Sequence, residues 1–240
     1  MTKNILKILA IFIIGTIGGI FADQILWPYF VERPLFLKYK LEQTPVYVTE
    51  RKEVTNYIQE NVALKEAAGK AAKTIVGVKT ETNEGNILRG SGLVVSNDGF
   101  FVTLADLVPQ GSDFAFYVGD KWPEYQILKR DLKSNLALVK VDGAGLATAG
   151  FADLEKIKIG ERVFLSGFDF SSTTPQMAVN EGIIKIFDKN LIQTNIFDAV
   201  SLNGSPLFDI EGNVIGLSIV GSSGQVSAIP AAKIRQFIGF

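Results

Sequence analysis

Two serines in an irregular loop are candidate nucleophiles for a hydrolytic reaction. Residues 192–208 read IQTNIFDAVSLNGSPLF, a short β-like run, a loop with Asn-Gly and Ser-Pro turn signals, and a second apolar run. Ser201 and Ser205 lie in that loop. A serine attacks a carbonyl only when a base takes its proton, and histidine is the usual base because its pKa lies near neutrality. The chain has no histidine and no cysteine, so it can supply neither a Ser-His nor a Cys-His relay.

A lysine could in principle replace the missing histidine. A desolvated lysine can act as the base of a Ser-Lys dyad, and Lys185, Lys189 and Lys233 belong to the same half of the chain as the loop. Nothing in their spacing singles one of them out. We therefore expect Ser201 and Ser205 to be ordinary loop serines, with solvated lysines nearby by chance.

Four further side chains are weaker candidates for chemistry or ligand binding. Asp106 and Asp198 could form an acid–base pair, but surface or loop carboxylates are the default interpretation. Phe168 and Phe170 could line a ligand site, but we expect them to pack in the core or in a cleft wall. The missing histidine and cysteine also remove imidazole and thiolate metal sites, so no cofactor or metal is expected.

Composition limits the function further. Of the 240 residues, 47% are hydrophobic and 20% are charged, which is typical of a globular chain. The formal net charge is -1 and no long basic stretch occurs. Because nucleic-acid affinity comes largely from neutralised phosphates, we expect no nucleic-acid partner.

Short β runs separated by turns must position these groups. They fill residues 74–230 in two sets of six, which indicates an all-β pair of barrels or sandwiches with a break near 143–150. The hairpins GLVVSNDGFFVT and PLFDIEGNVIGLS echo each other. A helix is predicted to begin near Asn61, and AAKIRQFI at 231–238 predicts a short amphipathic helix that packs on the second set.

The N-terminus predicts a membrane helix. Residues 8–22 carry no charge, and residues 5–26 can reach the about 20 residues that a span needs. A cleavable signal peptide is the alternative, but Ile20 is too bulky for a small-x-small cleavage site. We expect an uncleaved anchor at 1–26 with its N-terminus in the cytoplasm, because Lys3 and Lys7 precede the apolar run. Residues 27–60 then form a juxtamembrane stalk.

Three blocks, in order, resemble trypsin-like serine proteases of the HtrA/Deg family. GSGLVVSNDGFFVTLADLV at 90–108 is similar to the family block that ends V-T-x-x-H-V-V, and KRDLKSNLALVKV at 129–141 to the block that ends D-x-x-x-D-L-A-L-L-K-V. IQTNIFDAVSLNGSPLFDIEGNVIGL at 192–217 aligns without a gap to I-Q-T-D-A-A-I-N-x-G-N-S-G-G-P-L-x-N-x-x-G-x-V-I-G. The resemblance covers about 61–240 and implies a trypsin-like double β-barrel, with lobes at about 61–145 and 150–240. The PDZ module usual in the family is not expected.

Under this resemblance the three catalytic positions are substituted. Asp106 matches the histidine position, Asn135 the aspartate position and Asn203 the serine nucleophile. An amide is no useful nucleophile, and a carboxyl with a reference pKa of about 3.9 is a poor proton acceptor at pH 7. Loss of the serine or the histidine alone costs about 10⁶ in turnover in subtilisin. The resemblance therefore implies the fold without an intact catalytic residue.

The loop that would stabilise an oxyanion is altered too. The family run G-N-S-G-G is matched by Ser201, Leu202, Asn203, Gly204 and Ser205, so one glycine of three remains. We expect Ser201 and Leu202 to be strained where glycine allows positive φ, and the loop to take a different shape.

The function predicted from these patterns is binding without cleavage. We expect an extracytoplasmic, bacterial and periplasmic pseudoprotease that holds an extended peptide or a partner protein in the inter-lobe cleft or on an edge strand. An atypical or conditionally active serine endopeptidase is one alternative, and a structural or oligomerisation module of an envelope assembly is another. The resemblance alone implies a homo-trimer.

Overall fold

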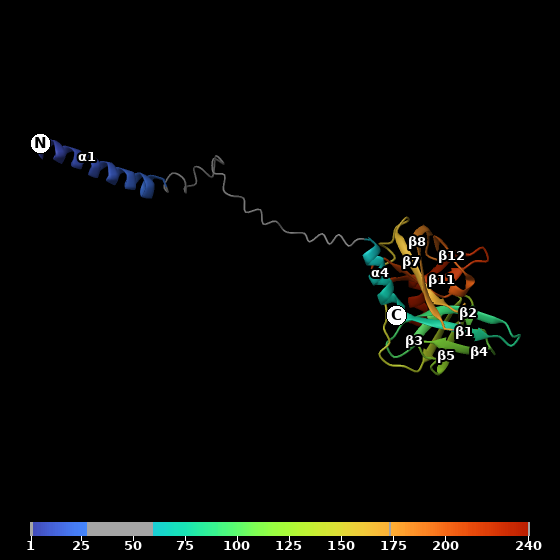
Figure 1. Ribbon diagram of the computed structural model, residues 1–240. Helices are drawn as coiled ribbons and strands as arrows, with labels where there is room; N and C mark the ends of the chain where they lie inside the picture. The colour runs from blue at the N-terminus through green and yellow to red at the C-terminus, as the bar shows by residue number, and fades with distance from the viewer. Residues whose placement is uncertain (1, 28–59, 173, 240) are drawn as a thin grey trace. The chain divides into compact units, whose positions relative to one another are not determined.

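The computed structural model describes residues 2–27, 60–172 and 174–239 (Figure 1). Contacts divide the chain into two compact units, residues 1–56 and 57–240, and each is described by itself.

The first unit contains a long apolar helix. α1 (Thr2–Phe21) continues into a π-helical turn, η1 (Ala22–Leu26). Within the described ranges, Lys3–Leu26 is the one helix long and apolar enough to cross a membrane, with 24 residues. This helix lies where the anchor at 1–26 is predicted, and its function as an anchor stays a prediction. Almost all of the predicted stalk at 27–60 lies outside the described residues.

A second helix leads into the β-rich unit. α4 (Glu60–Ala71) begins one residue before the predicted start near Asn61, and a 3-10 turn, η2 (Ala72–Thr74), connects it to the first strand. Ala67 and Ala71, four residues apart on one helix face, are 4% and 1% exposed. This small-residue face lets α4 pack closely on the core of the unit.

Six strands form the first sheet, in the order β4-β1-β2-β3-β6-β5. The outer strands pair with β1 and β6 and not with each other, so the sheet closes only half-way into a barrel. Phe114 and Phe116 fill the gap, with ring centroids 6.0 and 5.0 Å from that of Tyr125. The strands are β1 (Ile75–Glu81), β2 (Ile87–Val94), β3 (Phe100–Thr103), β4 (Asp113–Tyr117), β5 (Tyr125–Asp131) and β6 (Leu136–Val141).

The other six strands form a closed barrel, in the order β10-β11-β12-β9-β8-β7. Alternate side chains such as Leu165, Ile192 and Ile215 point inward and are fully buried, as the period of two in a β-strand requires. The strands are β7 (Arg162–Asp169), β8 (Gln176–Phe187), β9 (Ile192–Phe197), β10 (Pro206–Asp209), β11 (Val214–Val220) and β12 (Gln225–Pro230).

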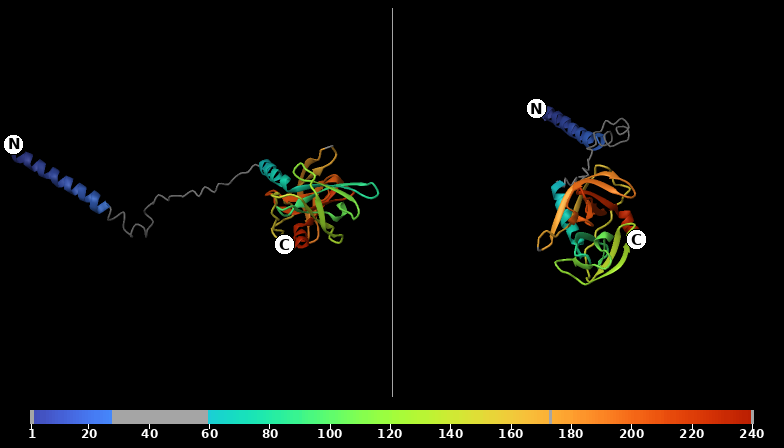
Figure 2. Two further views of the ribbon diagram at one scale, coloured as in Figure 1. Left: turned by 90° about the horizontal axis from the view of Figure 1, so that it is seen from below. Right: turned by 90° about the vertical axis from the view of Figure 1, so that its right-hand side faces the viewer.

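The predicted all-β fold with two six-stranded lobes is confirmed, with the difference that the first lobe is a half-barrel. Figure 2 shows the green strands of the first sheet beside the orange and red strands of the barrel. The echoing hairpins are β2–β3 and β10–β11. The predicted break at 143–150 falls between the end of β6 at Val141 and the start of β7 at Arg162.

The C-terminal helix joins the two lobes. α5 (Ala231–Ile238) follows β12 directly, as predicted. Its buried Ile234 and Phe237 belong to the core shared with the first sheet, and Lys129 Nζ donates to the Phe237 carbonyl at 3.0 Å. The helix packs on β11 and β12 of the second lobe, as expected, and its buried face also reaches β6 of the first lobe.

Candidate functional site

Asp106 and Asn135, which match the histidine and aspartate positions, are bonded to each other. Asp106 lies on a 3-10 turn, η3 (Ala105–Leu107), after β3, and Asn135 immediately precedes β6. Asn135 Nδ2 donates to Asp106 Oδ2 at 2.7 Å, and the Asp106 N–H donates to Asn135 Oδ1 at 3.0 Å. Asn135 has a φ of 54°, a left-handed conformation that asparagine tolerates better than most residues. Both ends of the Asn135 amide are thus used on Asp106, the Nδ2 group on its carboxylate and the Oδ1 atom on its backbone N–H.

Asn203, at the nucleophile position, bonds to both lobes. Its carbonyl accepts from the Ser91 N–H of β2 at 2.8 Å, and its side-chain Oδ1 accepts from the Val220 N–H of β11 at 2.7 Å. β2 and the Asn203 loop lie very close together at Gly90. A Cβ at this position would overlap Leu107 and lie 2.5 Å from the Asn203 carbonyl oxygen. Since Leu107 follows Asp106 directly, the structure brings the three positions into one region, between η3 and the loop after β9.

Three backbone N–H groups around Asn203 are engaged, two within the loop and one with β11. A 3-10 turn, η4 (Val200–Leu202), lets the Asn203 N–H donate to the Val200 carbonyl at 3.0 Å and the Leu202 N–H to the Ala199 carbonyl at 2.9 Å. Gly204 N–H donates to the Ser218 carbonyl at 2.9 Å. A donor bonded to its own chain is not aimed at a developing oxyanion.

The strain expected at Ser201 and Leu202 is absent. Among the described residues, only Asp120 and Asn135 combine a side chain with positive φ, and Gly204 takes the left-handed conformation in this loop with a φ of 72°. Ser201 and Leu202 avoid the conformation by winding into η4.

Ser205 is buried where the second lobe meets the first. It is fully buried, and its Oγ has no hydrogen-bond partner in the described structure. Its hydroxyl fills the space above Gly167 of β7, where an added Cβ would lie 2.7 Å from Ser205 Cβ and 2.9 Å from Ser91 Oγ. A buried hydroxyl cannot reach a substrate carbonyl, which removes the geometric basis of a Ser205 nucleophile.

The remaining candidates have ordinary structural surroundings. Asp198 Oδ2 accepts from Asn180 Nδ2 at 2.8 Å, and its Oδ1 accepts from the Ala199 N–H at 2.8 Å. Lys233 Nζ lies 3.4 Å from the Asn190 carbonyl. Lys185 and Lys189 are exposed.

Phe168 and Phe170 lie between the lobes. They are 9% and 8% exposed, and a Cβ on Gly77 of β1 would meet both rings, at 3.2 and 2.8 Å. They act as packing residues, as predicted. Sequence reasoning missed their neighbour Ser91, whose Oγ accepts from the Phe168 N–H at 2.8 Å. The Gly-Ser-Gly run at 90–92 was the available signal, since glycines mark close approach of another chain segment.

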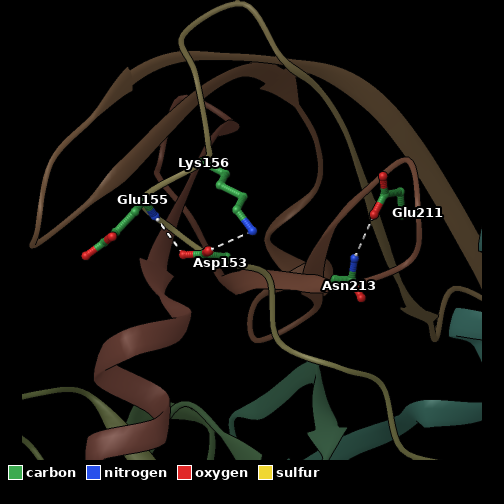
Figure 3. A network of polar contacts seen from close by, with 5 residues as sticks. All are labelled: Asp153, Glu155, Lys156, Glu211 and Asn213. Atoms are coloured by element: carbon green, nitrogen blue, oxygen red, sulfur yellow. Dashed lines mark hydrogen bonds and ion pairs between the residues drawn. The ribbon is translucent and has the colours of Figure 1, made fainter.

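An acidic hollow of about 390 Å³ lies away from these positions, on the second lobe. Figure 3 shows part of its wall, where Lys156 forms a 3.2 Å ion pair with Asp153 and Asn213 donates to Glu211. Asp209 is committed to its own turn, because its carboxylate accepts from the Asn213 N–H at 2.8 Å. In the residues that the structure covers, no three His, Cys, Asp or Glu side chains are grouped to hold a metal ion.

A family model named trypsin-like peptidase domain matches residues 90–217, which is more than half of the chain and includes all three triad positions. The chain belongs to the trypsin-like peptidase family. Among relatives of this family, the "probable periplasmic serine endoprotease DegP-like" protein of Pseudomonas putida is 30% identical over 138 residues, covering 54% of this chain and 28% of the relative. Serine protease HTRA1 of Xenopus laevis is 30% identical over 167 residues, covering 62% of this chain and 35% of the relative.

A solved structure shares the fold of this trypsin-like chain. The structure titled HtrA-type protease AlgW with tripeptide superposes with a TM-score of 0.65 at 23% identity, and the match covers 73% of this chain and 62% of that one. This structure supports the fold, and the DegP-like and HTRA1 sequence relatives confirm the predicted resemblance to HtrA/Deg proteins. The match spans about a third of the length of these curated relatives, so the activities in their names are not assigned to this chain.

Proposed function

We propose that this chain is a membrane-anchored, non-proteolytic member of the trypsin-like family that binds an extended peptide segment of a partner protein. The observation that carries the proposal is how the side chains at the three triad positions are engaged. Asp106 and Asn135 bond to each other, and Asn203 bonds to the Val220 N–H of β11. Proteolysis needs a nucleophile, a base and an oxyanion site. Here the corresponding groups are amides, a carboxylate and backbone donors already bonded within the loop.

The proposed peptide site is the edge of β11 beyond the end of β10. Ser218 exchanges backbone hydrogen bonds with Gly204 and Ser205, and the backbone groups of Val220 face the same side, two residues further along the strand. β10 begins only at Pro206, opposite Leu217, so it does not cover Val220, and Asn203 Oδ1 is bonded to the Val220 N–H. A peptide added at this edge would take over that N–H through its own carbonyl.

We propose that the anchor places the trypsin-like unit outside the cytoplasm. Lys3 and Lys7 precede the apolar run of α1, which favours a cytoplasmic N-terminus under the positive-inside rule. The periplasmic location stated in the name of the Pseudomonas putida relative supports the same side.

Light scattering on residues 57–240 tests the trimer that the resemblance implied.

Purified protein is expected to show no hydrolysis of casein or of fluorogenic peptides and no labelling by a fluorophosphonate probe. An active HtrA-type protease serves as the positive control, and Ser205→Ala as the matched variant. Turnover or labelling that disappears in Ser205→Ala would overturn the proposal in favour of an atypical serine hydrolase. Turnover that survives this change would indicate a contaminant or another nucleophile, and Ser201→Ala separates these two.

Asn203→Ala is expected to tighten peptide binding two- to tenfold. The variant removes the group that competes for the Val220 N–H, and a net hydrogen bond contributes about 0.5–1.5 kcal/mol. Peptides selected from an immobilised peptide array supply the ligand, and fluorescence anisotropy measures Kd. Faster amide exchange at Val220 checks that the edge has opened. Weaker binding in Asn203→Ala, with Val220 exchanging faster, would remove β11 as the site.

A further inference from the structure

We propose that a groove along α5, remote from the triad positions, binds an acidic peptide segment that carries apolar side chains. Two hollows that share Lys233 and Gln236 form this α5 groove. It is independent of the β11 edge and extends the proposed binding function to a second surface.

The first hollow of the α5 groove is mainly apolar. Its volume is about 540 Å³, within the range of ordinary ligand pockets. Leu154, Ile157 and Phe187 line it, all half-buried, so their outer faces are open to a ligand. Lys189 and Glu155 stand among the lining residues. A leucine or phenylalanine side chain of a partner would gain burial here.

The second hollow, of about 420 Å³, is basic. Lys129, Lys133 and Lys233 line it. Lys129 is oriented by the α5 C-terminus, since its Nζ donates to the Phe237 carbonyl and lies 4.4 Å from the centroid of the Phe237 ring. Such a fixed ammonium loses little side-chain freedom when an acidic group binds.

Asp131, the one acidic residue among the described residues that line this hollow, already accepts hydrogen bonds with both of its carboxylate oxygens. Its Oδ2 accepts from the Ser134 hydroxyl at 2.7 Å and its Oδ1 from the Lys133 N–H at 3.0 Å. These hydrogen bonds, with the Ser134 hydroxyl first, hold the pKa of Asp131 below its usual range. The carboxylate makes its hydrogen bonds within its own turn, and the Lys129 charge adds a smaller contribution to the lowered pKa.

The charge of the α5 groove indicates an acidic partner. The α5 groove carries four lysines against Asp131 and Glu155, while residues 60–240 as a whole carry 17 Lys and Arg against 20 Asp and Glu. A basic groove on an acidic domain favours acidic ligands over the rest of the surface. A peptide suits it better than a lipid surface does, because a flat bilayer would also press on both carboxylates, and because Gln236 and Ser134 offer hydrogen bonds that a peptide backbone can meet.

Residues 57–240 are suited to the test, since this unit is compact on its own and contains both hydrophobic cores. The probe is a fluorescent 12-residue peptide that alternates Glu with Leu. It is expected to bind at least tenfold tighter than a peptide of Lys with Leu or of Glu with Ser, and nuclear magnetic resonance shifts should concentrate on α5 and residues 129–134. Equal affinity for all three peptides, or shifts elsewhere, would overturn the proposal.

Lys133→Gln combined with Lys233→Gln is expected to weaken binding at least fivefold and to reduce its dependence on salt. Lys121→Gln, in the turn between β4 and β5 at the opposite end of β5 from Lys129, is the matched control and should bind normally. Resonance shifts on α5 without shifts at Val220 separate the α5 groove from the β11 edge. Binding of vesicles with 40% phosphatidylglycerol, lost in the double lysine variant, with no binding of the acidic peptide, would replace a peptide by a lipid surface and refute the proposal.

Discussion

Gly167→Ala is expected to destabilise the trypsin-like unit by about 2–3 kcal/mol, the upper part of the usual cost of overpacking a core. The added Cβ would overlap Ser205 Oγ and lie 2.7 Å from Ser205 Cβ. Rotating the hydroxyl does not relieve the second contact, so the backbone of β7 or of the loop must move. Urea unfolding of residues 57–240, followed by circular dichroism, measures the change.

Ser205→Gly should rescue this variant. Alone it removes a buried hydroxyl without a partner, which favours folding, and adds a flexible glycine, which opposes it by up to about 1 kcal/mol. The double variant Gly167→Ala, Ser205→Gly is therefore expected to return to within about 1 kcal/mol of the parent. A double variant as unstable as Gly167→Ala alone would mean that Ser205 is not the group that excludes a side chain at 167.

Restoring the triad without the loop is expected to leave the chain nearly inactive. The variant Asp106→His, Asn135→Asp, Asn203→Ser regains the chemical groups, but η4 still engages the N–H groups around position 203. Adding Ser201→Gly, Leu202→Asn and Ser205→Gly rebuilds the family run and is expected to raise hydrolysis at least about 100-fold. That factor is the lower end of what one oxyanion donor contributes.

Hydrolysis of a fluorogenic peptide at pH 8 compares the two variants. The six-fold variant with alanine at position 203 is the matched control and should be inactive, because it keeps the rebuilt loop without a nucleophile. If the triad variant alone equalled the six-fold variant, the η4 hydrogen bonds would not limit the reaction. Circular dichroism must confirm that both variants are folded.

The sequence was sufficient for the fold because its signals are local or lie in ordered blocks. Alternating apolar residues and turn pairs such as Asn97-Asp98-Gly99 define strands one at a time. The half-closed first sheet could not be predicted, because its gap depends on how the rings of Phe114, Phe116 and Tyr125 pack in space.

The candidate site was predictable in position and not in geometry. Asp106 and Asn135 lie 29 residues apart, and their reciprocal bonding depends on how η3 meets the turn before β6. The burial of Ser205 depends likewise on Gly167 in another strand. In both cases a side chain meets a partner that is distant in the sequence, and a single sequence does not contain that information.

The hydrogen bonds of Ser91 give the loop after β9 a mechanical role. The Ser91 N–H donates to the Asn203 carbonyl, and the Ser91 Oγ accepts from the Phe168 N–H. One residue of the first lobe is thus bonded to two separate segments of the second. These bonds exist whether or not a reaction takes place nearby. The loop after β9 therefore helps to hold the two lobes together, a structural function that does not depend on catalysis.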